Sequence, residues 1–145
     1  KTHEKIAKQM KADVFINRHE SEPVKTLKEL TDGRGPDVVL EMSGARDAVL
    51  QALEAVRPVG IVSVLGLPTK PIEIDVAKFI VLKDLVFRGI YGRRIWDTWK
   101  TTSSLLNSGK LDISPMITHR LKLEEFEKGV QAMKSGESGK VVMFP

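Results

Sequence analysis

Short apolar runs alternate with helix-like segments along most of the chain, and this alternation constrains the fold more than any other feature. Three of the runs are predicted strands, at residues 37–42, 60–66 and 85–92. Between and after them, apolar residues recur at helical spacing, at about 45–56 and 94–107. The runs lack strict alternation of apolar and polar residues, which is typical of parallel strands covered on both faces. We therefore predict an α/β fold, with a doubly wound parallel sheet and right-handed crossovers.

The beginning and the end of the chain differ from this central pattern. The chain opens without methionine in a helix-like segment, where Ile6 and Met10 share one face, and we interpret it as a piece of a longer polypeptide. A β-rich run at 13–17 is predicted as a further strand, and Pro23 begins a predicted helix. After Gly109 the pattern becomes strand, helix and strand, at about 116–123, 123–134 and 140–144. We expect two parts, 1–109 and 110–145, and the second need not join the first sheet.

Composition excludes several classes of protein. The chain contains no cysteine, which excludes disulfides and thiolate metal sites and fits a cytoplasmic protein. Its net charge of +4 comes from interspersed charges, so no nucleic-acid surface is indicated. No apolar stretch is long enough to cross a membrane, and no secretory signal opens the chain.

Familiar catalytic and phosphate-binding motifs are absent from the sequence. It has no G-x-G-x-x-G after a strand, no P-loop and no G-x-S-x-G nucleophile turn. The run "SGESGK" at 135–140 resembles a phosphate loop, but it follows a helix and precedes a strand, so a helix end and a turn explain it better. The three histidines have no ligand partner at metal-binding spacing.

The three predicted strands share one feature at their ends. They end in "EMSG", "VLGLP" and "GIYGR", each with a glycine at or beside the last apolar residue. Ligands of open α/β sheets bind outside the carboxyl ends of the strands, and glycine lets the backbone approach a ligand closely. The glycines could equally serve the turns alone. Glu41 lies within the first apolar run, and we expect it to make structural hydrogen bonds near the cleft and not to be catalytic.

Five motifs in the same order and at similar spacing resemble the C-terminal part of the medium-chain, zinc-dependent alcohol dehydrogenases. They are "PDVVLEMSGA", "VSVLGLP", "FRGIYGR", "SGKLDISPMITHRLKLEEFEKGVQAM" and "KSGESGKVVMF". Within that superfamily, "LEMSGA", "GIYGR" followed by "TW", and "ITHR" are most similar to the L-threonine 3-dehydrogenases. The resemblance covers essentially the whole chain. It implies that the chain is the second half of an NAD-binding domain plus a segment that returns to the catalytic domain.

The resemblance also implies which residues approach the NAD cofactor. The positions expected at the nicotinamide half are Leu65, Gly66, Leu67, Ile90 and Tyr91, largely through backbone groups. Three further positions are expected elsewhere along the cofactor: Met42 near the nicotinamide ribose, Lys140 near the pyrophosphate and His3 near the adenosine ribose. Nothing in the sequence decides between NAD and NADP.

The reaction implied is hydride transfer from the hydroxyl-bearing carbon of L-threonine to the nicotinamide, giving 2-amino-3-oxobutanoate. A zinc ion would polarise the hydroxyl, with its ligands expected upstream of this chain, which alone should be inactive. The edge strand at 85–90 resembles one through which relatives pair, so a homotetramer is expected. Two alternatives stay open: a dehydrogenase of another alcohol or polyol, and a non-catalytic nucleotide-binding or interaction module.

Overall fold

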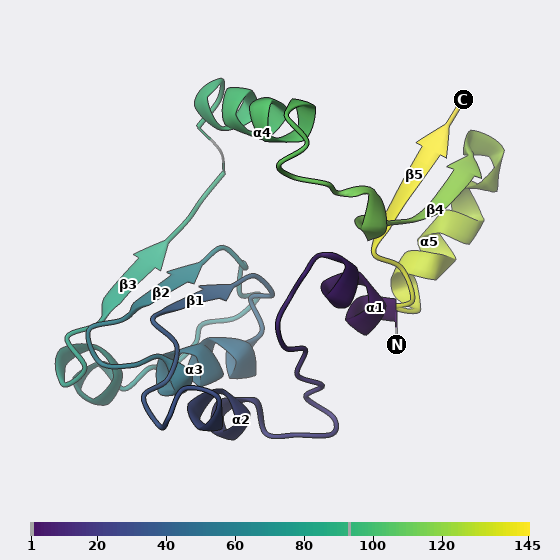
Figure 1. Ribbon diagram of the computed structural model, residues 1–145. Helices are drawn as coiled ribbons and strands as arrows, with labels where there is room; N and C mark the ends of the chain where they lie inside the picture. The colour runs from purple at the N-terminus through teal and green to yellow at the C-terminus, as the bar shows by residue number, and fades with distance from the viewer. Residues whose placement is uncertain (1, 93) are drawn as a thin grey trace. The chain divides into compact units, whose positions relative to one another are not determined.

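The computed structural model describes residues 2–92 and 94–145, which form two compact units (Figure 1). One unit is Ile16–Gly92. The other combines Lys1–Phe15 with Arg93–Pro145. No helix in the described part of the chain has the length and apolar character needed to cross a membrane.

A three-stranded parallel sheet forms the centre of the unit Ile16–Gly92. Its strands are β1 (Val38–Glu41), β2 (Ile61–Val64) and β3 (Val86–Gly89), in the order β1-β2-β3. The register places Val39 beside Val62, and Val62 beside Phe87. The parallel α/β sheet predicted from the alternation of apolar runs and helices is therefore confirmed.

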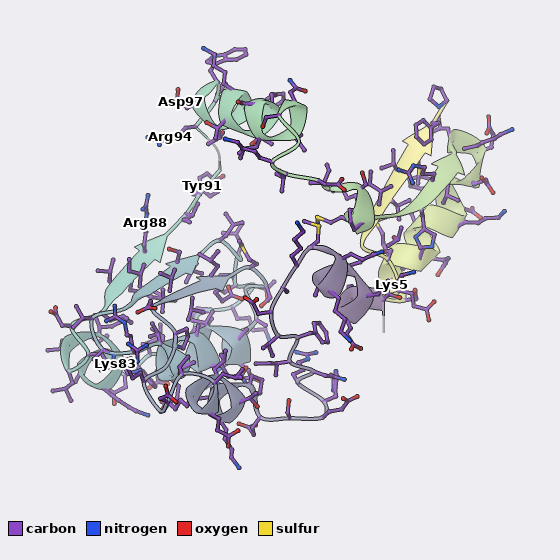
Figure 2. The ribbon with its side chains drawn as sticks, viewed as in Figure 1. Lys5, Lys83, Arg88, Tyr91, Arg94 and Asp97 are labelled. Carbon is purple, nitrogen blue, oxygen red and sulfur yellow. The ribbon has the colours of Figure 1, made fainter. Side chains whose placement is uncertain are left out.

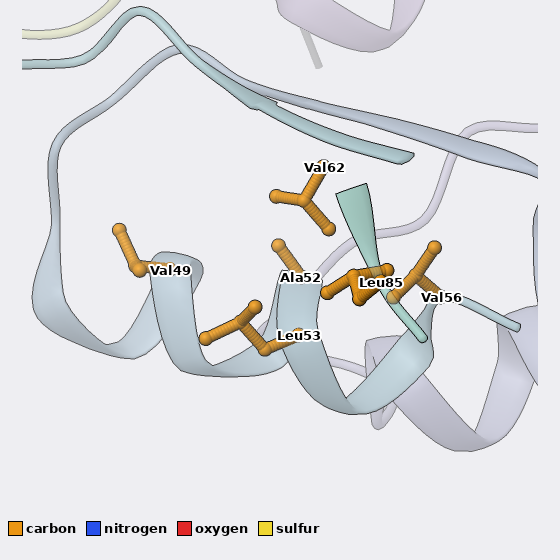
Figure 3. Close-up of a cluster of buried hydrophobic side chains, with 6 residues drawn as sticks. All are labelled: Val49, Ala52, Leu53, Val56, Val62 and Leu85. Atoms are coloured by element: carbon orange, nitrogen blue, oxygen red, sulfur yellow. The ribbon is translucent and has the colours of Figure 1, made fainter. Parts of the chain in front are cut away.

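Two α-helices lie against one face of this sheet (Figure 1). They are α2 (Pro23–Glu29) and α3 (Arg46–Ala55). Proline begins α2, where its missing N–H group costs no helical hydrogen bond. A single turn of π-helix, η1 (Ala77–Val81), lies in the segment between β2 and β3. Figure 3 shows the buried apolar cluster between α3 and the strands, formed by Val49, Ala52, Leu53, Val56, Val62 and Leu85.

The other face of the sheet carries apolar side chains that are largely exposed. Val38, Ile61 and Val86 share this face through the strand register, and Leu40 follows Val38 on β1. These four side chains are 37% to 60% exposed. The prediction that the strands are covered on both faces is therefore wrong for the described residues, because α2 and α3 both lie on the same face.

The strand predicted at 13–17 is also wrong. This segment has no strand structure, although its composition favours one. A strand needs a hydrogen-bonding neighbour, and within the described residues β1 pairs only with β2. Local β propensity without a neighbouring strand therefore leaves this segment as an irregular connection.

Lys83 holds the carboxyl-terminal end of α3 near the start of β3. Its Nζ donates hydrogen bonds to the carbonyl oxygens of Leu53, Glu54 and Val56, at 2.7, 3.1 and 2.8 Å. These carbonyls lie in the last turn of the helix and just beyond it, where helical partners run out. Burial lowers the pKa of Lys83 below its ordinary value. The contact fixes α3 at the end of the sheet opposite to the strand ends that carry glycine.

The second unit contains its own small sheet and three α-helices. Its parallel strands are β4 (Ile117–Lys122) and β5 (Lys140–Phe144), and its helices are α1 (Thr2–Gln9), α4 (Asp97–Asn107) and α5 (Phe126–Lys134). Short 3₁₀ turns, Ser114–Met116 and Leu123–Glu125, flank β4. The strand–helix–strand pattern predicted after Gly109 is thus confirmed as a separate sheet. The domain boundary at residue 109 remains a prediction.

Candidate functional site: a cleft at the strand ends

A cleft of about 810 Å³ opens at the carboxyl ends of β2 and β3. Its walls come from the ends of these two strands, from the connector that follows β2, and from Val49 of α3. Apolar side chains predominate, and Lys70 carries the one charge among the described lining residues. Small-molecule sites commonly have this size and character, with volumes of about 300–1,000 Å³.

Five of the eight residues predicted from the sequence line this cleft together. They are Leu65, Gly66 and Leu67 after β2, and Ile90 and Tyr91 after β3. Leu67 is 73% exposed and Tyr91 is 89% exposed, and Figure 2 shows Tyr91 just beyond the end of β3. The strand pairing continues to the edge of the cleft, where the Ile90 N–H donates to the Val64 carbonyl oxygen at 2.9 Å. The wall is therefore hydrogen-bonded as part of the sheet up to Ile90.

The turn after β1 and the turn after β2 are packed backbone against backbone. A Cβ atom placed on Gly66 would lie 2.0 Å from the Gly44 nitrogen, and one placed on Gly44 would lie 2.6 Å from the Leu67 carbonyl oxygen. Gly44 also has a φ of +70°, a conformation that favours glycine. Both glycines are required by this contact, so Gly66 contributes backbone to the cleft wall and leaves no room for a side chain toward Gly44.

Glu41 fixes this pair of turns from inside the protein. Its side chain is 4% exposed and accepts hydrogen bonds from the Ser43 backbone N–H at 2.8 Å and from the Ser43 hydroxyl at 2.5 Å. The Gly44 N–H donates to both carboxylate oxygens, at 3.0 and 3.1 Å. Burial by itself raises the pKa of Glu41, but the hydrogen bonds from Ser43 and Gly44 outweigh it, and the pKa lies below its ordinary value.

The structural role expected for Glu41 is thus confirmed, with neighbouring backbone and hydroxyl groups as its partners. These donors satisfy the carboxylate locally, and among the described residues its hydrogen-bond partners are neutral groups of Ser43 and Gly44. An odd carboxylate inside an apolar strand, followed by Ser and Gly, was the sequence signal for this turn. The signal did not show that the turn also contacts Gly66.

Met42 lies outside the lining of the cleft. Its side chain borders a smaller hollow of about 300 Å³ beside the end of β1, which α2 and α3 also line. Its placement near the nicotinamide ribose therefore stays a prediction that the cleft does not support directly.

His3 and Lys140 belong to the other unit. There, the His3 ring nitrogen Nε2 lies 3.3 Å from the carbonyl oxygen of Ser138, so the first helix contacts the turn 135–140 that precedes β5. Gly139 fits tightly in this contact, since an added Cβ would lie 2.7 Å from Cδ1 of Ile6. The structure brings His3 and the turn before Lys140 together within this unit, and their contact with a cofactor remains a prediction.

Sequence reasoning missed the contribution of the connector after β2. Residues 68–74 provide much of one wall, with Lys70, Ile72 and Ile74 among them, and Phe87 of β3 lies in the same lining. Ile72 and Ile74 also pack against the buried cluster. In "PIEID", isoleucines alternate with acidic residues, and this alternation is the signal that could have shown one side of the segment to be covered.

The lining of the cleft is chemically compatible with the nicotinamide half of a dinucleotide. Its apolar lining suits an aromatic ring, and Gly66 and Leu67 belong to that lining. Among the described lining residues the one charge, on Lys70, is positive, which suits a ligand that carries phosphates. A zinc ion, in contrast, has no matching ligands here. The described residues contain no group of three or more potential metal ligands, and the whole sequence contains no cysteine.

Comparison with protein families gives a match to the zinc-binding dehydrogenase family over residues 1–108. The L-threonine 3-dehydrogenase of Thermococcus kodakarensis is 47% identical over 97% of this chain, and that of Bacillus subtilis is 41% identical over 97%. In both cases the match covers 41% of the relative. The chain thus spans about two fifths of the length of the relatives that it matches.

A solved structure has the same fold. The crystal structure of an alcohol dehydrogenase from Thermotoga maritima superposes with a TM-score of 0.83 at 36% sequence identity. The superposition covers 97% of this chain and 40% of that one.

Proposed function

This chain belongs to the zinc-binding dehydrogenase family, and we propose that it is the cofactor-positioning part of an NAD-dependent L-threonine 3-dehydrogenase. The observation that carries the proposal is the 40–47% identity to enzymes of that name along almost the whole chain. The cleft supports it, because the residues expected at the nicotinamide lie together at the ends of β2 and β3. We place the enzyme in the cytoplasm.

The proposed reaction oxidises the side-chain hydroxyl of L-threonine to give 2-amino-3-oxobutanoate. When bound, NAD would accept the hydride from the hydroxyl-bearing carbon. The residues of this chain hold and orient the cofactor. Backbone groups from Leu65 to Leu67 form one side of its seat, Ile90 and Tyr91 form the adjoining side, and the apolar lining keeps water away from the ring.

The zinc ion of the proposed enzyme would bind outside this chain. The described residues do not offer a ligand set, so we propose that the metal binds to parts of the enzyme that this chain does not contain. We also propose that Met42, Lys140 and His3 contact the sugar and phosphate portions of the cofactor. Residues 1–109 would then belong to the cofactor domain, and residues 110–145 would pack on the catalytic domain.

Self-association is the further part of the proposal. The order of the sheet leaves β3 at an edge, with all four of its residues exposed. An exposed strand edge presents unpaired N–H and C=O groups to a second chain. We propose that two copies pair along β3 and that these pairs assemble into a homotetramer.

A dehydrogenase of another alcohol or polyol is the second candidate function. The observation in its favour is the similarity to the structure of an alcohol dehydrogenase from Thermotoga maritima. Substrate choice depends on residues around the reacting carbon, and the cleft described above lies at the cofactor. The cofactor cleft of this chain is therefore equally compatible with both candidate functions.

The test is turnover by the full-length protein. We expect NADH formation, followed by absorbance at 340 nm, with kcat/KM for L-threonine at least about tenfold above that for a polyol such as sorbitol. A higher kcat/KM for the polyol would replace the first candidate by the second. Binding of NAD without turnover of any alcohol, in zinc-loaded protein, would instead favour a non-catalytic nucleotide-binding module.

A further inference from the structure

The buried carboxylate of Glu41 is connected to the wall of the cleft, although Glu41 itself lies outside it. It lies one strand away from the cleft, and its residue does not line it. Nevertheless, both its main chain and its side chain reach the end of β2. The Glu41 carbonyl oxygen accepts hydrogen bonds from the Leu65 N–H at 2.8 Å and from the Gly66 N–H at 3.3 Å.

The side chain of Glu41 makes a second connection to the end of β2, through the turn formed by Ser43 and Gly44. Its carboxylate binds the Ser43 and Gly44 N–H groups, and this turn touches Gly66 and Leu67 backbone to backbone. A Cβ on Gly66 would also lie 2.7 Å from Oε2 of Glu41 itself. The carboxylate, the Ser43–Gly44 turn and the Gly66–Leu67 turn therefore form one packed stack, whose last layer is the cleft wall.

We propose that Glu41 is a positioning residue for the nicotinamide end of the cofactor. It acts through the Ser43–Gly44 turn, which holds Gly66 and Leu67 in the place where their backbone groups meet the ring. The proposal rests on the proposed function, because it takes NAD as the occupant of the cleft.

An ionised carboxylate suits this position for a physical reason. Hydrogen bonds to a charged acceptor are shorter and stronger than those to a neutral one. One oxygen of Glu41 accepts three of them, from two backbone N–H groups and a hydroxyl. In Glu41→Gln, a neutral oxygen replaces this acceptor, and the NH₂ group takes the place of the second oxygen, which among the described residues accepts only from Gly44. Two donors then face each other, and the turn should shift.

The decisive measurement compares two ligands that differ only at the nicotinamide. ADP-ribose retains the adenosine, the pyrophosphate and the second ribose of NAD but lacks the nicotinamide ring. A turn that positions the ring should affect only NAD, whereas a general loss of folded protein would weaken both ligands. Calorimetric titration of the full-length protein, at a temperature where every variant is folded, gives both dissociation constants.

For Glu41→Gln we expect the Kd for NAD to rise about tenfold, the equivalent of one charged hydrogen bond, and the Kd for ADP-ribose to change less than about twofold. Amide hydrogen exchange at Gly44 and Leu67 should become faster. Ser43→Ala removes the hydroxyl that donates to Glu41 and accepts from the Ala45 N–H, and it should raise the Kd for NAD in the same direction but by less. The matched control is Glu29→Gln, an exposed carboxylate on α2.

The outcomes separate this proposal from the one on which it rests. If the wild-type protein does not bind NAD, the proposed function and the positioning role both fall. If the wild-type protein binds NAD, two results would overturn the positioning role alone. In the first, Glu41→Gln raises the Kd for NAD and the Kd for ADP-ribose by the same factor. In the second, it changes neither Kd. If Glu41→Gln does not fold, Ser43→Ala decides, and equal effects on the two ligands would overturn the role.

Discussion

At the scale of single residues, two glycines and one glutamate shape the candidate site more than any side chain within it. Gly44 and Gly66 allow two neighbouring turns to touch through their backbones, and Glu41 accepts the hydrogen bonds that hold one of them. Strand-end glycines could have served the turns alone or a ligand. In this chain Gly66 serves both needs, since the packing that excludes its side chain also leaves its backbone open to the cleft.

Gly66→Ala should therefore destabilise the protein. The new methyl group would meet backbone atoms of Ser43 and Gly44, which cannot move aside as a flexible side chain can. We expect a loss of about 1–3 kcal/mol, as for other overpacked sites, measured as a lower unfolding temperature in calorimetry of the full-length protein. Gly89→Ala is the control, because a Cβ at Gly89 meets nothing within 4 Å and should change stability by less than about 0.5 kcal/mol. Equal stability of the two variants would contradict the packing described.

At the scale of elements, the alternation of hydrogen bonds along β3 shows which of its groups face outward. The N–H of Val86 donates to Gly60 and that of Ile90 donates to Val64, both toward β2. In a strand of a parallel sheet, intervening residues direct their groups the other way. The N–H groups of Phe87 and Gly89 therefore face the free edge, where a second copy of the chain is proposed to pair.

Gly89→Pro tests the pairing along this edge. Proline removes an outward N–H and leaves the ladder to β2 intact, as edge strands tolerate. We expect the assembly of the full-length protein to become smaller, measured as molar mass by light scattering after size exclusion. Gly89→Ala keeps the N–H and should keep the assembly. An unchanged mass for the proline variant would show that the copies associate through another surface.

At the scale of the whole chain, the sheet of Ile16–Gly92 is half covered. Helices α2 and α3 lie on one face, and Val38, Leu40, Ile61 and Val86 leave the other apolar and exposed. A contiguous apolar patch of this kind is usually an interface, because soluble proteins rarely leave one open to water. The face therefore requires a cover when the protein is assembled.

The 145-residue chain expressed on its own should bind the hydrophobic dye ANS more strongly than the full-length protein does. The physical reason is the exposed sheet face, which other parts of the full-length protein are expected to cover. Replacing Val38 and Val86 by threonine keeps β propensity and should lower the dye fluorescence of the isolated chain. Equally weak fluorescence from the isolated chain and the full-length protein would mean that the chain covers this face by itself.

The sequence alone determined the local structure and the family. Helical spacing, the proline at the start of α2 and the apolar runs identified the helices and three parallel strands, because these signals are local. Motif order identified the dehydrogenase family. The ends of the strands could be predicted to share one edge because parallel strands present their carboxyl ends together, and the family resemblance implied Leu65, Leu67 and Tyr91 as the individual residues there.

Only the tertiary structure decided which strands pair, which sheet faces are covered and which turns touch, because these features depend on segments that are distant in sequence. The segment 13–17 has the composition of a strand but lacks a partner, and β1 to β3 have the composition of covered strands but keep one open face. The contact of Gly44 with Leu67 joins residues that are distant in sequence, so no local pattern could show it. Propensity and periodicity report what a segment can form. Pairing, coverage and backbone contact depend on which other segments arrive beside it.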